Sequence, residues 1–334
     1  APAGAPRSIE TNDSYPLFRR VQFLMSKPLT NKVAVVAGAT RGAGRGIATM
    51  LGEAGATVYC TGRSVRGNVA TQGRTETIEE TAALVTQLGG HGIPVQVDHR
   101  DEAQVEALFA RVEAEQRRLD ILVNDIWGGD WFVLKMWNKP MWETDIADVE
   151  PLYRTAIFTH IITSRYGAPL LVKQGHGLLI EITDGDTDRY RGNFLYDLLK
   201  HTVNRMAFNL AEDLRPFGVT ALALTPGFLR SEEMLDHFGV TEANWREGAR
   251  KDPHFIASET PWFVGRAAAA LAADPNVAQK AGGVFSSWGL SDAYGFVDRD
   301  GSRPHWGNHF HKYFVEEAPL PPVDELIAAH ERGQ

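Results

Sequence analysis

The chain has 334 residues, 43% of them hydrophobic and 23% charged, so it holds enough apolar side chains to bury a sizeable core. Its formal net charge of -8 argues against nucleic acid or an anionic membrane surface as a partner, because both select basic patches. Cys60 is the single cysteine, which rules out an intrachain disulfide and favours a reducing, cytoplasmic location.

Residues 1–30 are predicted to form an N-terminal extension. They mix charged residues such as Arg7, Glu10 and Arg19 with prolines and contain no uninterrupted apolar run. We therefore expect neither a secretory signal nor a spanning helix in them, and no membrane partner for the chain.

Short apolar runs then alternate with amphipathic stretches. The apolar runs predict buried parallel strands at residues 33–36, 56–59, 93–97, 119–123, 178–182, 219–224 and 283–286. The stretches between them have helical spacing at residues 79–88, 102–116, 149–173, 196–215 and 262–273. This alternation predicts an α/β fold, a Rossmann-type doubly wound parallel sheet of about seven strands with helices on both faces, over residues 31–289.

An aromatic insertion, residues 129–148, interrupts the alternation after the fourth predicted strand. With the residues just before it, this region holds four of the eight tryptophans: Trp127, Trp131, Trp137 and Trp142. Loops at the carboxyl ends of such strands bind ligands, so the insertion is either a pocket wall or a surface flap packed by its own rings.

Residues 290–334 are predicted to be a C-terminal extension that wraps the core. The extension carries four histidines: His305, His309, His311 and His330. They have no supporting cysteine or carboxylate pattern, so we interpret them as solvated side chains and expect no metal site.

The segment Gly38-Ala39-Thr40-Arg41-Gly42-Ala43-Gly44 follows the first predicted strand and opens a helix. Glycines at this point let the backbone turn tightly and approach phosphate, and the N-H groups of the helix N-terminus bind a pyrophosphate. The context of strand, turn and helix therefore predicts a dinucleotide site at Gly38, Gly42 and Gly44.

Residues after the next strands indicate which dinucleotide binds. Arg63 stands where an NAD-selective enzyme presents an acid to the ribose hydroxyls, and Arg41 is a second cation in the glycine turn. Both suit a 2'-phosphate, which points to NADP(H), although a surface arginine is the alternative for Arg63. Asp98 and Asn124 are placed to meet the adenine and ribose or to fix the loop.

Tyr196 and Lys200 lie four residues apart, on one face of a predicted helix. The ammonium lowers the phenol pKa from its usual value near 10, so Tyr196 becomes a usable general acid or base. Helices often contain this spacing by chance, but here it follows the fifth predicted strand.

These motifs together resemble the short-chain dehydrogenase/reductase family over residues 32–289. The glycine turn, Leu119-Asp120-Ile121-Leu122-Val123-Asn124, Tyr196-x-x-x-Lys200 and Pro226-Gly227 follow the family's order at close to its spacing. Trp142-Glu143-Thr144 in the insertion and Tyr294-Gly295…Asp300-Gly301 in the tail resemble its dehydrogenase/reductase member 1 branch.

The resemblance implies hydride transfer between NADPH and a carbonyl-type carbon of a small-molecule substrate, with Tyr196 moving the proton. Lys200 would bind the nicotinamide ribose, and Pro226, Gly227 and Ser231 would contact the cofactor. Family members commonly assemble through their long helices, so a homodimer or homotetramer is expected.

Two departures from the family pattern concern the substrate. Thr183-Asp184 replaces the family's Ser-Ser, and strand alignment puts Asp184 in the place of the serine that orients the substrate oxygen, whereas counting back from Tyr196 selects Thr183. The family's asparagine in the long helix has no match near Tyr153 or Arg154, so its proton relay is in doubt.

An ionised Asp184 would oppose a developing alkoxide but would stabilise a cationic iminium, which favours a nitrogen-containing substrate beside a carbonyl one. Alternatively, Asp184 caps a turn or is protonated, and Thr183 supplies the hydroxyl. The altered positions also motivate a second hypothesis, an isomerase or cyclase that binds the nucleotide without net redox turnover.

Overall fold

The computed structural model describes residues 27–129, 132, 135–137 and 139–332. Most of the predicted N-terminal extension, and Trp131 of the aromatic region, lie outside these described residues. Among the residues that are described, no helix has both the length and the apolar character needed to cross a membrane.

A seven-stranded sheet in the order β3-β2-β1-β4-β5-β6-β7 forms the centre of the molecule. All of its strand pairs are parallel, which confirms the predicted Rossmann-type sheet. The strands are β1 (Val33–Ala37), β2 (Thr57–Gly62), β3 (His91–Gln96), β4 (Ile121–Asn124), β5 (Gly177–Ile182), β6 (Val219–Thr225) and β7 (Val284–Ser286).

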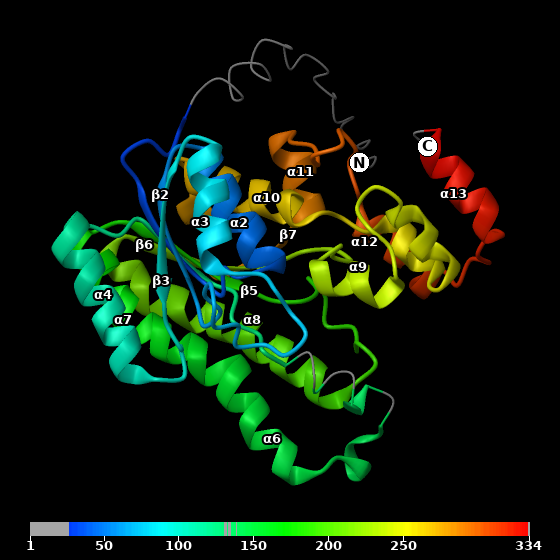
Figure 1. The fold of residues 1–334 in the computed structure, drawn as a ribbon, viewed down its shortest axis with the longest axis horizontal. Coiled ribbons are helices and arrows are strands. Elements are labelled where there is room, and N and C mark those ends of the chain that lie inside the picture. Colours follow the sequence, from blue (N-terminus) through cyan, green and yellow to red (C-terminus); the bar gives the residue numbers. More distant parts are fainter. Residues whose placement is uncertain (1–26, 130–131, 133–134, 138, 333–334) are drawn as a thin grey trace, which may run out of the picture.

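Helices cover both faces of the sheet, as Figure 1 shows. On one face lie α2 (Gly42–Glu53), α3 (Ile78–Gln87), α10 (Pro261–Ala273) and α11 (Ser287–Tyr294). On the other lie α4 (Glu102–Gln116), α7 (Thr159–Gln174) and α8 (Phe194–Leu214). Alternate strand residues point to opposite faces, so Ala34 and Val36 join the first core and Val33 and Val35 the second.

The predicted helix over residues 149–173 is longer and less regular than expected. It begins with α6 (Ile146–Tyr153), passes through a π-helical turn, η2 (Arg154–Phe158), and continues as α7. Periodicity gives no sign of such a turn, because the turn adds a residue without breaking the helix. Pro151 lies within α6, just before the π turn.

Residues beyond α11 form the remaining helices. These are α12 (Trp306–Phe310), the π turn η7 (His311–Val315) and α13 (Val323–Glu331). Earlier in the chain, α9 (Glu232–Phe238) follows β6, and short 3-10 turns lie between the other elements. Ile327 of α13 packs into a small core with Trp245 and Phe255, outside the sheet.

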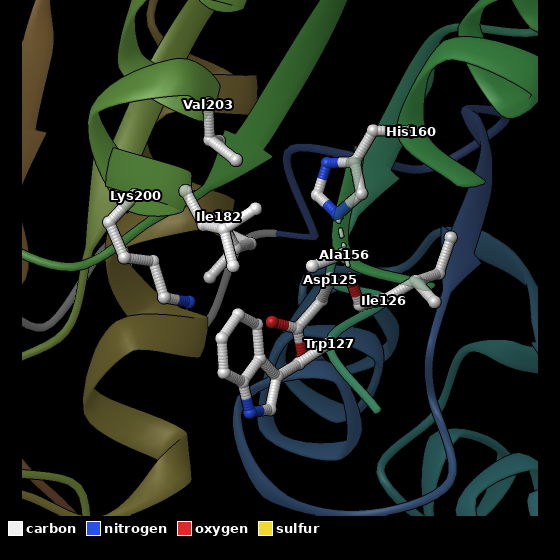
Figure 2. A pocket seen from close by; sticks show the side chains of 9 residues that line it. Asp125, Ile126, Trp127, Ala156, His160, Ile182, Lys200 and Val203 are labelled. Atoms are coloured by element: carbon white, nitrogen blue, oxygen red, sulfur yellow. Dashed lines mark hydrogen bonds between the residues drawn. The ribbon is translucent and has the colours of Figure 1, made fainter. Parts of the chain in front are cut away.

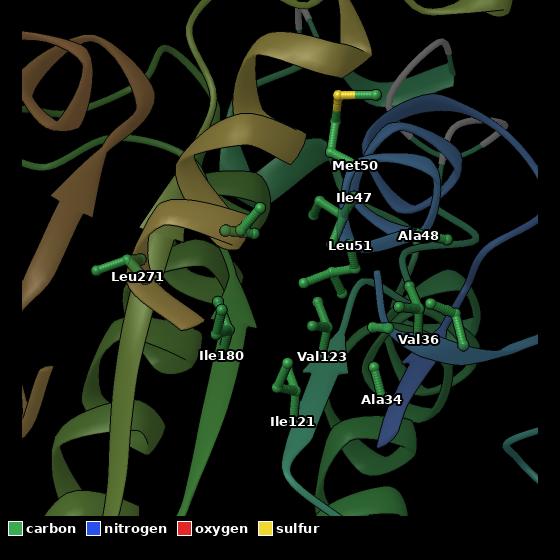
Figure 3. Packing of buried hydrophobic residues seen from close by; sticks show 14 of the residues in the cluster. Ala34, Val36, Ile47, Ala48, Met50, Leu51, Ile121, Val123, Ile180 and Leu271 are labelled. Atoms are coloured by element: carbon green, nitrogen blue, oxygen red, sulfur yellow. The ribbon is translucent and has the colours of Figure 1, made fainter. Parts of the chain in front are cut away.

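The core between the sheet and α2 is packed by aliphatic side chains, shown in Figure 3. Val36, Val123 and Ile180 face Ile47 and Leu51 of α2. Helices α2 and α10 also pack against each other, and at Gly46 and Gly265 their backbones come so close that a Cβ on either glycine would strike the other helix.

We predict that Gly265→Ala destabilises the protein by about 1–3 kcal/mol, although alanine is the better helix former, because its methyl would strike the Gly46 carbonyl. Gly289→Ala is the matched control: it lies in α11, and its methyl would meet only the Ser286 hydroxyl at 3.1 Å. Urea unfolding of both variants measures the effect. Equal free energies of unfolding would contradict the close helix contact.

Candidate active site

The carboxyl ends of β1 and β4 meet where the strand order reverses, which is the usual ligand crevice of an open α/β sheet. Gly38 follows β1 with φ +92, and a side chain there would clash with the Asp125 carbonyl after β4. Its N-H donates to the Thr61 carbonyl at 3.1 Å, so three strand ends are held together at this glycine.

The N-terminus of α2 carries the other predicted glycines. Gly44 has no room for a Cβ, because Gly38 and Asp125 crowd it. The Gly42 N-H donates to a carboxylate oxygen of Glu232 at 2.8 Å, and Arg45 lies 3.4 Å from the other oxygen of that carboxylate. This helix end therefore binds an anion already, supplied by α9.

Glu232 is not among the predicted site residues. Its signal in the sequence is weak, an acid directly after Ser231 in the segment that follows β6. Ser231 itself caps α9, accepting from Met234 N at 3.3 Å, and lies next to Gly42.

Arg63 lies close to two other guanidinium groups. Burial, followed by the positive charges of Arg100 and Arg41, lowers the pKa of Arg63, while Asp98 opposes the shift. Asp98 itself pairs with Arg100 at 2.5 Å, which keeps the Asp98 pKa below its usual value. Three arginines and one aspartate thus gather beyond β2 and β3, and an arginine remains charged at any ordinary pH. Arg100 was not predicted.

Asn124 is fully buried. Its amide donates to Glu181 Oε1 at 2.8 Å and to Ser164 Oγ at 2.9 Å. The side chain therefore points into a polar cluster between β5 and α7, and its predicted roles toward the nucleotide or the loop stay predictions.

Tyr196 lies in the first turn of α8, and Asn193 caps this helix by accepting from the Leu195 and Tyr196 N-H groups at 3.1 Å. The Tyr196 hydroxyl donates to Asp184 Oδ2 at 2.5 Å. Thr183 is buried, and its hydroxyl donates to the Lys200 carbonyl at 3.0 Å. Of the two candidates for the serine position, Asp184 is therefore the residue at the phenol.

Aromatic rings surround the Tyr196 side chain. Trp127 and Trp137 contact its ring edge-on, with centroids 5.5 and 5.2 Å away, and the Lys200 ammonium lies 4.2 Å from the centre of the Trp127 ring. Trp142 is 80% exposed. Of the described tryptophans in this region, two therefore lie at the tyrosine and one lies at the surface.

The segment after β6, with the predicted Pro226 and Gly227, is held by a buried carboxylate. Glu259 accepts from the Gly227 N-H at 2.9 Å and from Ser287 Oγ at 2.5 Å. Burial raises the pKa of Glu259 to about 8. Glu259 was not predicted, because nothing in the sequence marks a buried carboxylate 32 residues further along the chain.

The C-terminal extension contacts two loops of this region. Trp306 packs so closely on Gly227 that a Cβ there would lie 2.7 Å from the Trp306 Cβ. Arg189, in the loop before α8, donates to the Phe314 carbonyl and lies over the Phe310 ring. These contacts hold part of the C-terminal segment against the loops that follow β5 and β6.

The tail histidines have separate environments. His309 lies 2.9 Å from a ring nitrogen of His254, and burial lowers the pKa of His309 to about 4. His305 faces Asp292, and His311 faces Glu316. No group of three or more histidine, cysteine or carboxylate side chains in the described part of the chain is arranged to hold a metal ion.

These observations describe one continuous region at the carboxyl edge of the sheet. It has a glycine-lined turn with an anion at a helix N-terminus, a cluster of arginines, and a phenol that donates to a carboxylate. Such a region can bind a phosphate-bearing nucleotide and move a proton beside it.

Comparisons with known proteins agree with this geometry. A family model described as short chain dehydrogenase matches residues 32–239. The chain is 35% identical over 285 residues to human "Dehydrogenase/reductase SDR family member 1", covering 83% of this chain and 86% of the human protein. It is 26% identical to the "NADP-dependent 3-hydroxy acid dehydrogenase YdfG" of Escherichia coli K12, covering 70% and 88% of the two chains.

Solved structures share the fold. A short-chain dehydrogenase from Mycobacterium thermoresistibile superposes with a TM-score of 0.68 at 19% identity, covering 84% of this chain and 92% of the other. A hydroxysteroid dehydrogenase from Escherichia coli gives 0.62 at 22% identity, with 78% and 96% covered. On the matched family model and the similarity to the human protein, the chain belongs to the short-chain dehydrogenase/reductase family of oxidoreductases.

Proposed function

We propose that this protein is an NADPH-dependent oxidoreductase that reduces a carbonyl or iminium carbon of a small to medium organic substrate. The observation that carries the proposal is the Tyr196 hydroxyl, which donates to Asp184 beside Lys200 at the carboxyl edge of the sheet. Tyr196 acts as the general acid or base in this proposal.

Three features of the chain fit NADP(H). The crowding at Gly38 and Gly44 leaves a stretch of backbone without side chains. The N-terminus of α2 already binds a carboxylate. Arg41, Arg63 and Arg100 supply positive charge where a 2'-phosphate would lie. The NADP-dependent E. coli relative supports the same choice.

Glu232 sets a condition on this binding. Its carboxylate lies on the Gly42 N-H group that a pyrophosphate would use, so it has to move before a phosphate can take its place. Arg45 would then be released from its ion pair with Glu232 and would be available to the phosphate.

Bound NADPH supplies the hydride in this chemistry. The substrate carbon accepts the hydride with its electron pair, and the π electrons of its double bond move to the oxygen or nitrogen. Tyr196 would give its phenol proton to a carbonyl oxygen as the hydride adds, or to an imine nitrogen beforehand to form the iminium, and Lys200 would stabilise the phenolate that remains. The reverse sequence oxidises an alcohol or amine.

Asp184 favours a nitrogen substrate in the proposal. Its carboxylate is part of the site, with 40% of the side chain exposed and Arg191 at 3.9 Å. A negative charge beside the reacting group stabilises a cationic iminium and opposes an alkoxide, with an effect that partial solvent exposure weakens.

We further propose a cytoplasmic homodimer or homotetramer. Support for assembly comes from large apolar side chains exposed on η2, α7 and α8: Phe158, Ile161, Phe194, Leu198 and Phe208. Cys60, a free and buried thiol, is consistent with a reducing compartment.

We predict that Arg63→Ala weakens NADPH binding by about 10- to 100-fold and leaves NADH binding unchanged, because one charged hydrogen bond to the 2'-phosphate is lost. Isothermal titration with both cofactors measures this. Arg165→Ala, an exposed arginine on α7, is the control and should alter neither affinity. Equal affinity of the unaltered protein for the two cofactors would remove the role given to Arg63 and Arg41.

Tyr196→Phe is expected to lower kcat by about 100- to 10,000-fold, the usual contribution of a general acid, while the NADPH Kd stays the same. The measurement is NADPH oxidation followed by absorbance, on a panel of model aldehydes, ketones and cyclic imines. Unchanged turnover in the variant would take Tyr196 out of the mechanism.

Asp184 decides between substrate classes in the same panel. Asp184→Asn should lower the rate of cyclic-imine reduction about 10-fold or more and leave the rate of ketone reduction equal or faster. The reason is that the carboxylate charge stabilises the iminium cation but not the alkoxide. Asp184→Ser, which restores a hydroxyl, should favour ketones further. If both variants change imine and ketone rates by the same factor, the iminium proposal fails.

A further inference from the structure

A buried ion pair lies behind the Tyr196–Lys200 pair. His160 of α7 and Glu181 of β5 are 3% and 0% exposed, and His160 Nδ1 lies 2.5 Å from Glu181 Oε2. The other ring nitrogen of His160 lies 2.9 Å from the Ile126 carbonyl oxygen. With Glu181 ionised, both partners are acceptors, so both ring nitrogens donate and His160 is an imidazolium.

Charge and hydrogen bonding in the cluster agree with this protonation. Burial by itself lowers the pKa of His160, but the charge and hydrogen bond of Glu181 outweigh burial and leave that pKa raised, with Lys200 acting against them. Glu181 Oε1 accepts from Asn124 at 2.8 Å, and Ser164 Oγ lies 3.4 Å from the same oxygen. The carboxylate is therefore fixed from two sides.

The ion pair reaches the phenol through the chain that follows β4. His160 holds the Ile126 carbonyl, which belongs to the planar peptide group that joins Ile126 to Trp127. The position of the Trp127 backbone is therefore fixed. The Trp127 ring then lies under the Lys200 ammonium at 4.2 Å and edge-on to Tyr196. Figure 2 shows His160, Ile126, Trp127 and Lys200 lining one pocket.

The Trp127 ring is well suited to hold an ammonium in place. Tryptophan has the strongest cation-binding face of the aromatic side chains, and the attraction grows where water is kept out. The Lys200 side chain has four rotatable bonds. A fixed aromatic face therefore restricts where its charge lies relative to the Tyr196 hydroxyl.

We propose that Glu181 and His160 are positioning residues. They hold the Ile126 carbonyl and so fix the Trp127 ring, against which the Lys200 ammonium packs. The inference rests on the proposed function in that it takes Tyr196 and Lys200 as the proton-transfer pair. It gives the buried ion pair a role in the ionisation of Tyr196, beyond its role in the core.

The test reads the ionisation of Tyr196 without any substrate. The ultraviolet absorbance of tyrosinate is titrated against pH, and the titration of the matching Tyr196→Phe protein is subtracted in each background. Among the described residues, Asp184 and Lys200 lie at Tyr196, Arg191 lies beyond Asp184, and Asp125 lines the same pocket as Lys200; all four are kept in every variant.

The principal variant is His160→Leu with Glu181→Met, because exchanging a buried pair as a unit avoids an unpaired buried charge and keeps the net charge constant. We expect Tyr196 to ionise about one pH unit higher, a tenfold change in its ionisation constant, because the Lys200 ammonium is no longer held against the Trp127 ring. Trp127→Leu should give a similar shift and Trp127→Phe a much smaller one, because phenylalanine keeps an aromatic face.

Combining Trp127→Leu with the paired variant should add no further shift if both act through one path. A paired variant that keeps its Tm but leaves the Tyr196 midpoint unchanged would overturn the proposal, and so would fully additive shifts. Failure of the proposed function would appear elsewhere, as undiminished turnover in Tyr196→Phe, so the two failures are distinguishable.

Discussion

The close approach of the β1 and β4 carboxyl ends is the contact on which the rest of the site depends. Gly38 has no side chain, so the Asp125 carbonyl can lie against it, and the chain after β4 is then carried across the crevice toward α8. This brings Trp127 to Lys200 and Tyr196. A parallel sheet packed on both faces makes such a meeting of strand ends rigid, because neither strand can shift without disturbing two cores.

Charge at the site has an unusual distribution for a hydride acceptor site. The phenol donates to a carboxylate, Asp184, and the helix end expected to receive phosphate receives the carboxylate of Glu232. In the proposed function, Asp184 bears on the class of substrate and Glu232 on the entry of the cofactor. A third, Glu181, pairs with His160, and in our proposal it acts through position instead of net charge.

The sequence predicted the fold well because strand order follows from alternation. It also singled out residues at strand ends or at fixed spacing, such as Gly38, Tyr196 and Lys200, whose role at a site stays a prediction. Asp184 was preferred over Thr183 from strand alignment, and the structure places it at the phenol. Partners distant in the chain had no such signal. His160, Glu181, Glu232 and Glu259 act through tertiary contacts, and the π turn before α7 leaves the helical periodicity almost intact.

The central proposal, hydride transfer from NADPH to the substrate carbon, is tested most directly by isotope transfer. NADPH deuterated at both C4 positions is incubated with a substrate that the protein converts, and the product is analysed by mass spectrometry. The account predicts one deuterium on the reduced carbon and one NADP⁺ formed per product molecule. Product that carries no deuterium and leaves NADPH unconsumed would contradict it and would favour an isomerase or cyclase that uses the nucleotide only structurally.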